Sequence, residues 1–374
     1  MRTLGCKKSE LKILILCRYT RLGASSRVRL YQFIPGFEAA GITCEVQPLL
    51  NDRYLGDLYA GRALSKWNLV KGYAKVLGRL VDAKKYDCIL IEKEIFPYLP
   101  AFAERWLSAI GVPYIVDYDD AIFHNYDLHP NPFVRFLLGK KIARIMRRAA
   151  LVVCGNAYLR DYAMEAGARR VTVIPTVIDT GKYPVKTNGT AGPVVIGWIG
   201  SPTSVKYLRK LRPLLASLAE RYDVRVHLVG AMEGLGLGPT EKVLEWTEAG
   251  EASLIAAFDI GIMPLEDSPW ERGKCGYKLI QYMGGGLPVV GSPVGVNVEI
   301  IQEGVTGYKP ADETGWSEAL ETLIVDSTLR RRLGENGRVL AIERYSLVVA
   351  TQTWIHELKR ISHVRDIRND TLSN

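Results

Sequence analysis

The stretch FDIGIMPLEDSPWERGKCGYKLIQYMGGGLPVVGSPVG, residues 258–295, contains an apolar run, a polar loop, a short amphipathic segment and a second apolar run. Residues 258–263 are almost continuously apolar, which is typical of a strand in a parallel sheet with both faces covered. A helix is expected from Gly276 to the glycines at 284–286, with Pro288 leading into the next strand. This order predicts an α/β domain with a parallel sheet.

The same alternation extends over the rest of the chain. Further strands are expected at 12–17, 43–47, 86–92, 114–118, 151–154, 171–174, 194–199, 224–229 and 288–291. Helices are expected at 27–40, 101–110, 132–150, 157–166, 204–221, 276–283, 315–325 and 327–341. Residues 184–193, PVKTNGTAGP, interrupt the pattern like a linker. We therefore predict two doubly wound domains, over 1–187 and 188–345, and a helix over 346–374 that packs back on the N-terminal domain.

Composition narrows the class of protein. The chain has 374 residues, of which 48% are hydrophobic and 24% charged, as in folded α/β proteins rather than disordered or collagen-like ones. Its apolar runs are far shorter than the ~20 residues of a membrane span, and the start, MRTLGCKKSE, is a poor signal peptide. We expect a cytoplasmic protein. The six cysteines and five histidines lack metal-ligand spacing, so we expect no metal site built from them.

Positive charge gathers in the first half. Residues 1–187 carry 29 Lys and Arg against 17 Asp and Glu, a net +12, whereas residues 188–374 carry 20 against 23. Anionic lipid, nucleic acid or a phosphorylated substrate would suit the first half. The expected helix at 134–149 carries much of this charge, on Lys140, Lys141, Arg144, Arg147 and Arg148. Two interpretations stay open: a solvated helix face, or a patch that attracts anionic lipid head groups and lies at the inner face of the membrane.

The helix that follows Gly276 is a candidate diphosphate site. Lys274 and Lys278 lie near its start, where backbone N–H groups and the helix dipole favour anions. At 100° per residue, one face carries Lys278, Gln281 and Tyr282, and the opposite face carries Leu279, Ile280 and Met283. An ordinary surface helix with solvated lysines is the alternative.

Two more strand ends are candidate phosphate contacts. The segment VVIGWIGSPTSVKY, residues 194–207, places Gly200 and Ser201 after a strand, with Lys206 following. Glycines there allow a backbone to approach a phosphate, although many strand ends need glycine only to turn. After the first strand, the loop 23–26 begins at Gly23 and Arg27 enters the next helix. The serines of that loop are also compatible with a simple helix N-cap.

Three carboxylates, Asp117, Asp119 and Asp120, follow the strand at 114–118. Negative charges this close repel one another, so we expect either positive groups that neutralise them or a functional role for them. We expect Asp119 or Asp120 to act as a general base or to bind an acceptor hydroxyl. A metal site formed by Asp117 and Asp119 and a structural role for one of the three remain alternatives. His124 is expected to be an ordinary loop histidine.

Taken together, these segments resemble a known enzyme family. Three segments are similar to family 4 of the retaining glycosyltransferases, which have the GT-B fold: the glycine loop after the first strand at 23–26, the segment GWIGS at 197–201, and above all KCGYKLIQYMGGGLPVVGSPVGVNVEI at 274–300. GVTGYKPAD at 304–312 and ERYS at 343–346 add to the resemblance, which covers residues 11–360. It implies two Rossmann-like domains whose parallel sheets face each other across an interdomain cleft.

The resemblance also implies roles for single residues. A nucleotide-sugar donor would be held mainly by the C-terminal domain and a glycan, glycolipid or small-molecule acceptor mainly by the N-terminal one, without a metal. The family's Glu-x7-Glu signature falls on Gly273 and Gln281, so both glutamates are missing, and Gln281 would lie near the donor ribose. The phosphate-binding lysine of the family matches Lys206 or Lys278. A histidine common in the family aligns near Asp119.

The sequence thus predicts a retaining, metal-independent glycosyltransferase. Its donor contacts would be Gly23, Gly200, Ser201, Lys206, Lys274, Lys278 and Gln281, with Arg27 on the acceptor or a phosphate and Asp119 or Asp120 on the acceptor hydroxyl. Three alternatives are a sugar-nucleotide epimerase of the same fold, a metal-dependent transferase and a non-catalytic protein that binds membrane or nucleic acid. A non-catalytic binding protein would not explain the arrangement of residues in 258–295, and we expect no nucleic-acid partner.

Overall fold

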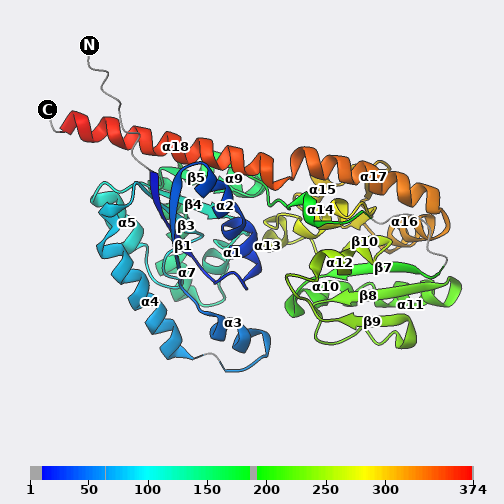
Figure 1. Ribbon diagram of the computed structural model, residues 1–374. Coiled ribbons are helices and arrows are strands. Elements are labelled where there is room, and N and C mark those ends of the chain that lie inside the picture. Colours follow the sequence, from blue (N-terminus) through cyan, green and yellow to red (C-terminus); the bar gives the residue numbers. More distant parts are fainter. Residues whose placement is uncertain (1–10, 64, 186–191, 373–374) are drawn as a thin grey trace, which may run out of the picture. The chain divides into compact units, whose positions relative to one another are not determined.

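A computed structural model describes residues 11–63, 65–185 and 192–372 of the chain (Figure 1). The chain divides into two compact units, the first formed by residues 1–174 and 351–374 and the second by residues 175–350. The first unit therefore ends thirteen residues before the expected boundary at 187. Most of the expected linker, residues 186–191, lies outside the described part.

The first unit is built on a six-stranded parallel sheet in the order β2-β1-β3-β4-β5-β6. Its strands are β1 (Leu11–Cys17), β2 (Ile42–Pro48), β3 (Cys88–Glu92), β4 (Tyr114–Tyr118), β5 (Leu151–Cys154) and β6 (Val171–Val173). All residues of β3, β4 and β5 are buried, as expected for strands covered on both faces. The carboxyl ends of these strands share one edge, where ligands of such sheets bind.

Helices of unequal length connect these strands. They are α1 (Ala24–Arg29), α2 (Ile34–Ala39), α3 (Asp52–Tyr59), α4 (Lys66–Val81), α5 (Phe102–Ala109), α6 (His124–Asp127), α7 (Pro132–Leu138), α8 (Lys141–Arg148) and α9 (Ala157–Glu165), with 3₁₀ turns at Tyr31–Phe33 and Ala83–Lys85. The long helix α18 (Leu347–Leu372) joins this unit from Thr351 onward. Its Trp354 is fully buried against Phe33 and Phe37, with ring centroids 6.2 and 6.4 Å apart.

The second unit repeats the design with the strand order β12-β11-β10-β7-β8-β9, again parallel. Its strands are β7 (Val194–Ile199), β8 (Val224–Val229), β9 (Glu241–Leu244), β10 (Ile260–Met263), β11 (Val289–Gly291) and β12 (Gly307–Tyr308). Its helices are α10 (Val205–Arg209), α11 (Arg212–Arg221), α12 (Glu251–Ala256), α13 (Pro269–Arg272), α14 (Tyr277–Gly284), α15 (Asn297–Ile300), α16 (Glu313–Val325) and α17 (Ser327–Arg344), with 3₁₀ turns at Thr180–Lys182, Pro202–Ser204 and Gly238–Thr240. Each sheet with its helices is a doubly wound α/β layer, which confirms the predicted fold class.

Several elements differ from the sequence prediction. The expected helix at 27–40 is broken into α1, a 3₁₀ turn and α2, because Pro35 begins a new helix at its first turn. Likewise, the expected helix at 204–221 is two helices, with Pro213 in the first turn of α11. Helices α3, α4, α6, α12, α13 and α15 and strands β9 and β12 are not predicted by the sequence pattern. No helix in the described ranges is both long enough and apolar enough to cross a membrane.

Candidate functional site

In the first unit, acidic and basic side chains meet where β1, β3 and β4 end. Asp119 follows β4, and its Oδ2 accepts a hydrogen bond of 2.6 Å from the hydroxyl of Ser25. Its Oδ1 lies 2.9 Å from the Nζ of Lys93, which follows β3. The same Nζ lies 3.3 Å from Oδ2 of Asp120. One ammonium group thus holds two carboxylates at the carboxyl edge of the sheet.

Glu92, the last residue of β3, joins the loop after β1 to this cluster. Its carboxylate accepts hydrogen bonds from the hydroxyls of Ser25 and Ser26, at 3.0 and 2.6 Å, and from the backbone N–H of Arg18 at 2.7 Å. The two serines are therefore not the helix caps that the sequence also allowed. The N-cap of α1 is Gly23.

Asp117 has a different role from its two neighbours. Both of its oxygens accept hydrogen bonds from the guanidinium of Arg29, at 2.6 and 2.9 Å, and both side chains are fully buried. Arg29 also donates to the carbonyl of Ile174. Asp117 therefore has a bidentate cationic partner of its own, and a metal ion bound by Asp117 and Asp119 would have to compete with this pair.

The charges around Asp119 set its protonation state. Burial alone would raise the pKa of Asp119, but the positive charges of Lys93 and Arg29 and the Ser25 hydrogen bond outweigh it, so that pKa is lowered. Burial likewise lowers the pKa of Lys93, yet the surrounding carboxylates raise it overall. The pKa of Glu92 is raised, chiefly by burial. The Lys93–Asp119 pair is therefore ionised near neutral pH.

In the second unit, the segment after β10 builds a lysine-bearing helix start. Gly276 caps α14 in the left-handed conformation (φ 64°), and an added Cβ there would approach Cδ1 of Ile300 to 2.3 Å, so this position strongly favours glycine. Lys274 and Lys278 flank this cap and are both partly exposed. The Nζ of Lys278 lies 5.8 Å from the centre of the Trp198 ring, at the end of β7. The dipole and the two lysines favour an anion at this position.

A buried tyrosine fixes α14 against the sheet. The hydroxyl of Tyr282 accepts a hydrogen bond of 3.0 Å from the N–H of Ile199 and donates one of 3.2 Å to the carbonyl of Ile262. It therefore links the ends of β7 and β10, the two strands that precede the segments carrying the lysines. The helix start is held rigidly relative to the sheet edge.

The loop after β7 is held by contacts among its own residues. Ser201 and Ser204 form a reciprocal capping box around the 3₁₀ turn at Pro202–Ser204. An added Cβ at Gly200 would come within 2.3 Å of the Trp198 ring, so packing inside the unit already requires this glycine. Lys206 is exposed, and its Nζ lies 4.8 Å from the centre of the Tyr207 ring.

The two units match two families of one enzyme class. Residues 19–176 match the family described as "Glycosyl transferase 4-like domain", and residues 193–326 match "Glycosyl transferases group 1". Together these matches cover more than half of the chain. The chain belongs to the group 1 glycosyltransferases.

Curated relatives of this glycosyltransferase are distant. It is 28% identical over 246 residues to MMP alpha-(1->4)-mannosyltransferase of Mycolicibacterium hassiacum, which covers 60% of the chain and 57% of that protein. The putative teichuronic acid biosynthesis glycosyltransferase TuaH of Bacillus subtilis is 22% identical over 286 residues, covering 67% of the chain and 68% of TuaH. The chain thus spans little more than half of the mannosyltransferase.

Solved structures with the same fold cover nearly the whole glycosyltransferase. Sucrose-phosphate synthase from Thermosynechococcus elongatus superposes with a TM-score of 0.72 at 14% identity, over 95% of this chain and 100% of the other. Anabaena HepE, solved in complex with UDP and glucose, superposes with a TM-score of 0.67 at 20% identity, over 94% of this chain and 100% of the HepE chain. At such identities the likeness establishes the GT-B fold, which confirms the expected architecture.

Gln281, which the resemblance placed near the donor ribose, is buried in this structure. Tyr282 is buried too, so Lys278 is the residue of the predicted polar face of α14 that is partly exposed. The Nε2 of Gln281 donates a hydrogen bond of 3.2 Å to the hydroxyl of Tyr183, which in turn donates to Glu251. In this glycosyltransferase, the residue at the position of the second signature glutamate is part of an internal hydrogen-bond chain.

The other candidates in the first unit are internal as well. Arg27 on α1 is only 6% exposed. An added Cβ at Gly23 would come within 2.4 Å of the Cβ of Tyr19, so the loop itself requires the glycine. His124 is engaged through both ring nitrogens, with Asp127 and with the hydroxyl of Tyr158, each at 2.9 Å. It is an ordinary hydrogen-bonded histidine as expected, but it begins helix α6 and does not lie in a loop.

The predicted basic patch on the glycosyltransferase needs correction. Lys141 is 1% exposed, and its Nζ binds the carboxylate of Glu94 and, at 2.6 Å, the carbonyl of Phe96. It is a buried ion-pair residue, not a surface cation. The exposed basic residues of the patch are Lys140, Arg144, Arg147 and Arg148.

Sequence reasoning missed the residues that organise the acidic cluster, Glu92 and Lys93. Lys93 adopts a positive φ of 66°, which is costly for a side-chain-bearing residue and is typical of functional sites. The available signal was the change from the apolar run CILI to the charged triplet EKE at 92–94, the same kind of strand end that singled out Asp119.

Proposed function

We propose that this protein transfers a sugar, with retention, from a nucleoside-diphosphate sugar to a hydroxyl acceptor in the synthesis of a cell-surface glycan or glycolipid. The observation that carries the proposal is the start of α14, where Lys274 and Lys278 flank a glycine cap that Tyr282 ties to the sheet. This arrangement suits the diphosphate of a sugar nucleotide.

The named relatives support this substrate class. HepE has been solved with UDP and with UDP-glucose, and two relatives are named as a mannosyltransferase and a teichuronic acid glycosyltransferase. We infer a nucleoside-diphosphate donor for this chain as well, and a carbohydrate-bearing acceptor.

On the donor side, the bond between the sugar C1 and the phosphate oxygen breaks, and negative charge builds on the departing diphosphate. Lys206, Lys274 and Lys278 neutralise that charge, with the backbone at Gly200 and Ser201 as further contacts. Fixed donors aimed at developing charge are worth roughly 3 kcal/mol each in other enzymes. A metal ion is not needed for this task.

On the acceptor side, the exposed fractions separate the two aspartates. The Asp120 side chain is 30% exposed and that of Asp119 12%. We assign the contact with the acceptor hydroxyl to Asp120, as base or orienting acceptor, and a positioning role through Lys93 to Asp119. Arg27 would serve a phosphate or the acceptor only if its buried side chain moves outward.

The test is a thermal-shift titration with UDP, GDP, ADP and their sugar conjugates, with and without EDTA. One nucleotide at 100 times its Kd should stabilise the protein by about 2.7 kcal/mol, and EDTA should leave the shift unchanged. Lys278→Ala should remove the shift and abolish transfer, whereas Lys210→Ala, an exposed residue paired with Glu266, should keep both. Normal transfer by Lys278→Ala, or donor consumption without any acceptor, would contradict the proposal.

A further inference from the structure

Helix α4 of the first unit carries more apolar surface than its sheet covers. Val76 and Leu80 are buried toward the core. A second apolar stripe, at the spacing of one helix face, is exposed: Trp67 by 64%, Val70 by 53%, Leu77 by 46% and Val81 by 79%. An exposed stripe of this size marks an interaction surface.

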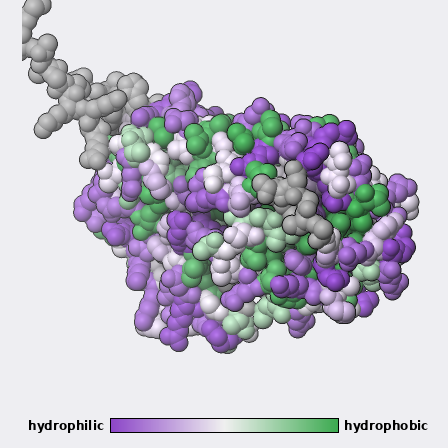
Figure 2. All heavy atoms as spheres, turned by 45° about the vertical axis from the view of Figure 1, so that its right-hand side comes forward, coloured by the Kyte–Doolittle hydropathy of each residue, from purple (hydrophilic) through white to green (hydrophobic). Residues whose placement is uncertain are grey.

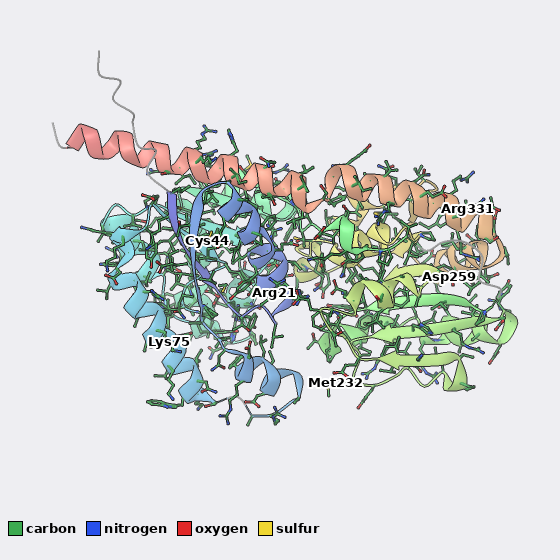
Figure 3. All side chains as sticks on the ribbon, viewed as in Figure 1. Arg21, Cys44, Lys75, Met232, Asp259 and Arg331 are labelled. Atoms are coloured by element: carbon green, nitrogen blue, oxygen red, sulfur yellow. The ribbon has the colours of Figure 1, made fainter. Side chains whose placement is uncertain are left out.

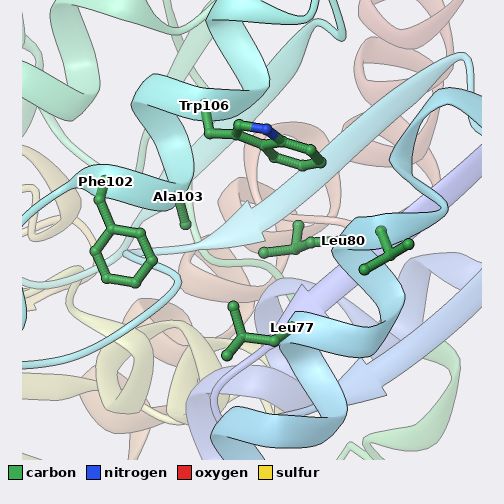
Figure 4. A pocket seen from close by; sticks show the side chains of 6 residues that line it. Leu77, Leu80, Phe102, Ala103 and Trp106 are labelled. Atoms are coloured by element: carbon green, nitrogen blue, oxygen red, sulfur yellow. The ribbon is translucent and has the colours of Figure 1, made fainter.

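Helix α5 extends this surface. Phe102 and Trp106 of α5 are 47% and 40% exposed. With Leu77, Leu80 and Val81 of α4 and Ala103, they line an apolar cavity of about 180 Å³ (Figure 4). An engineered apolar cavity of about 150 Å³ holds a benzene molecule, so this one has room for a hydrocarbon segment of that size. We call α4, α5 and this cavity the α4–α5 face.

The α4–α5 face is a rigid part of the fold. The Tyr73 hydroxyl, on α4, donates a hydrogen bond of 2.8 Å to the carbonyl of Pro97, in the loop that leads to α5. The ring of Phe96 lies between those of Tyr73 and Phe102, with centroids 4.9 and 5.5 Å away. The two helices therefore present their exposed side chains in a fixed arrangement.

The charges of α4 identify the kind of partner. Every charged residue in α4 is basic: Lys66, Lys71, Lys75 and Arg79. Figure 3 labels Lys75 on this helix. A second copy of α4 laid on the first would bring like charges together, whereas an anionic surface would be attracted. Figure 2 shows one face of the molecule, on which hydrophilic residues predominate and hydrophobic ones lie among them in groups.

We propose that the α4–α5 face docks on the surface of an anionic lipid bilayer. Trp67, Val70, Leu77 and Val81 enter the boundary between head groups and acyl chains, and the cavity receives part of one chain. The lysines of α4 bind the anionic head groups. Aromatic residues on the apolar face and lysines on the polar face are the pattern of helices that lie in a membrane interface.

This assignment moves the lipid-binding surface away from α8. The apolar residues of α8, Ile142, Ile145 and Met146, are all buried. Lys141 is buried as well and forms an ion pair with Glu94. Helix α8 itself therefore offers only exposed cations, and the exposed apolar residues near it, Phe133, Phe136 and Leu137, lie on α7. Helix α4 combines cations with exposed apolar side chains on one element.

The first experiment compares charges on the two helices by vesicle co-sedimentation of the full chain. We expect binding to vesicles of phosphatidylcholine with 30% phosphatidylglycerol and little binding to phosphatidylcholine alone. Lys66→Gln with Lys75→Gln should weaken the partition by roughly 30-fold, since each lysine near an anionic surface adds severalfold. The matched pair is Lys140→Gln, at the N-cap of α8, with Arg144→Gln, on α8, and it should leave the partition within about twofold. Equal losses in the two pairs would overturn the assignment to α4.

The second experiment tests the apolar contact. Trp67→Ser with Val81→Ser should lower binding at least tenfold, and lipids with brominated chains should quench fluorescence of the native protein more than that of this variant. Both residues are mostly exposed, so the unfolding temperature should stay unchanged. Unaltered binding and quenching would overturn the proposal. So would a native dimer in sedimentation that this variant converts to monomer, because the stripe would then be an interface between two copies.

Discussion

The Nζ of Lys93 lies 2.9 Å from Oδ1 of Asp119, and the lysine reaches it from a backbone with a φ of 66°. This pair joins the ends of β3 and β4, and the Ser25 hydroxyl ties it to the loop after β1. Three strand ends are thus held in place by one ion pair and its hydrogen bonds.

Lys93→Met should destabilise the first unit by about 3 kcal/mol at pH 7, because it leaves Asp119 and Asp120 without their cation. The pKa of Asp119 is lowered in the folded protein, so its ionised form contributes stability above the ordinary carboxyl pKa, and this contribution disappears as the pH falls through the folded-state pKa. The cost of Lys93→Met should therefore stay constant from pH 7 down to about pH 4 and shrink at lower pH, as the pH falls through the lowered pKa of Asp119. Hydrogen exchange of the β3 amides measures this loss of unfolding free energy in the first unit. A loss that does not change with pH would contradict the role assigned to the ionised Asp119.

Asp120→Asn should lower kcat by about 100-fold, as loss of a general base does, and leave the unfolding temperature nearly unchanged, because Asp120 is the more exposed carboxylate. Asp119→Asn should lower both kcat and the unfolding temperature, since it weakens the contacts of Asp119 with Lys93 and Ser25. Steady-state kinetics and thermal unfolding, measured on both variants, distinguish the catalytic role of Asp120 from the positioning role of Asp119. Full activity of Asp120→Asn would remove it from the acceptor site.

Tyr282→Phe should destabilise the second unit by about 1–3 kcal/mol, because the N–H of Ile199 and the carbonyl of Ile262 lose their buried partner. It should also weaken nucleotide binding, since the start of α14 is no longer fixed to β7. Isothermal titration with the nucleotide selected by the thermal-shift screen measures this effect. Tyr308→Phe, at a half-buried position of β12, is the control and should change neither quantity.

Trp354→Ala should cost about 3–5 kcal/mol in the first unit, because it empties the space between α18 and the rings of Phe33 and Phe37. Amide exchange should accelerate in β1 and remain slow in β7. Trp106→Ala, at a tryptophan that is 40% exposed, should cost much less. Equal acceleration in both strands would show that α18 does not act on the first unit alone.

The architecture could be predicted because buried parallel strands are apolar runs. The strands Tyr114–Tyr118, Leu151–Cys154, Val194–Ile199 and Val224–Val229 match the prediction at both ends. Helix α4 could not, because its exposed apolar stripe and its two glycines, Gly72 and Gly78, hide the contrast between core and solvent faces on which such predictions depend.

The site was harder to predict than the fold. The sequence pointed to the segments that follow β4, β7 and β10, where Asp119 lies in a loop and Lys206 and Lys278 lie on the helices α10 and α14. It does not show which groups pair across strands. Arg29 reaches Asp117 and Lys141 reaches Glu94 over long sequence separations, so two charges that look available in the sequence are already neutralised.

The return of the chain to its first unit also constrains the order of folding. Residues 1–174 are synthesised early, but the tryptophan that completes their packing lies at position 354, beyond the whole of the second unit. On the ribosome, the second unit can therefore become compact first, while Phe33 and Phe37 stay uncovered until α18 emerges. A fragment that stops before residue 351 would leave those rings exposed to aggregation or to chaperones, even though its sheet is complete.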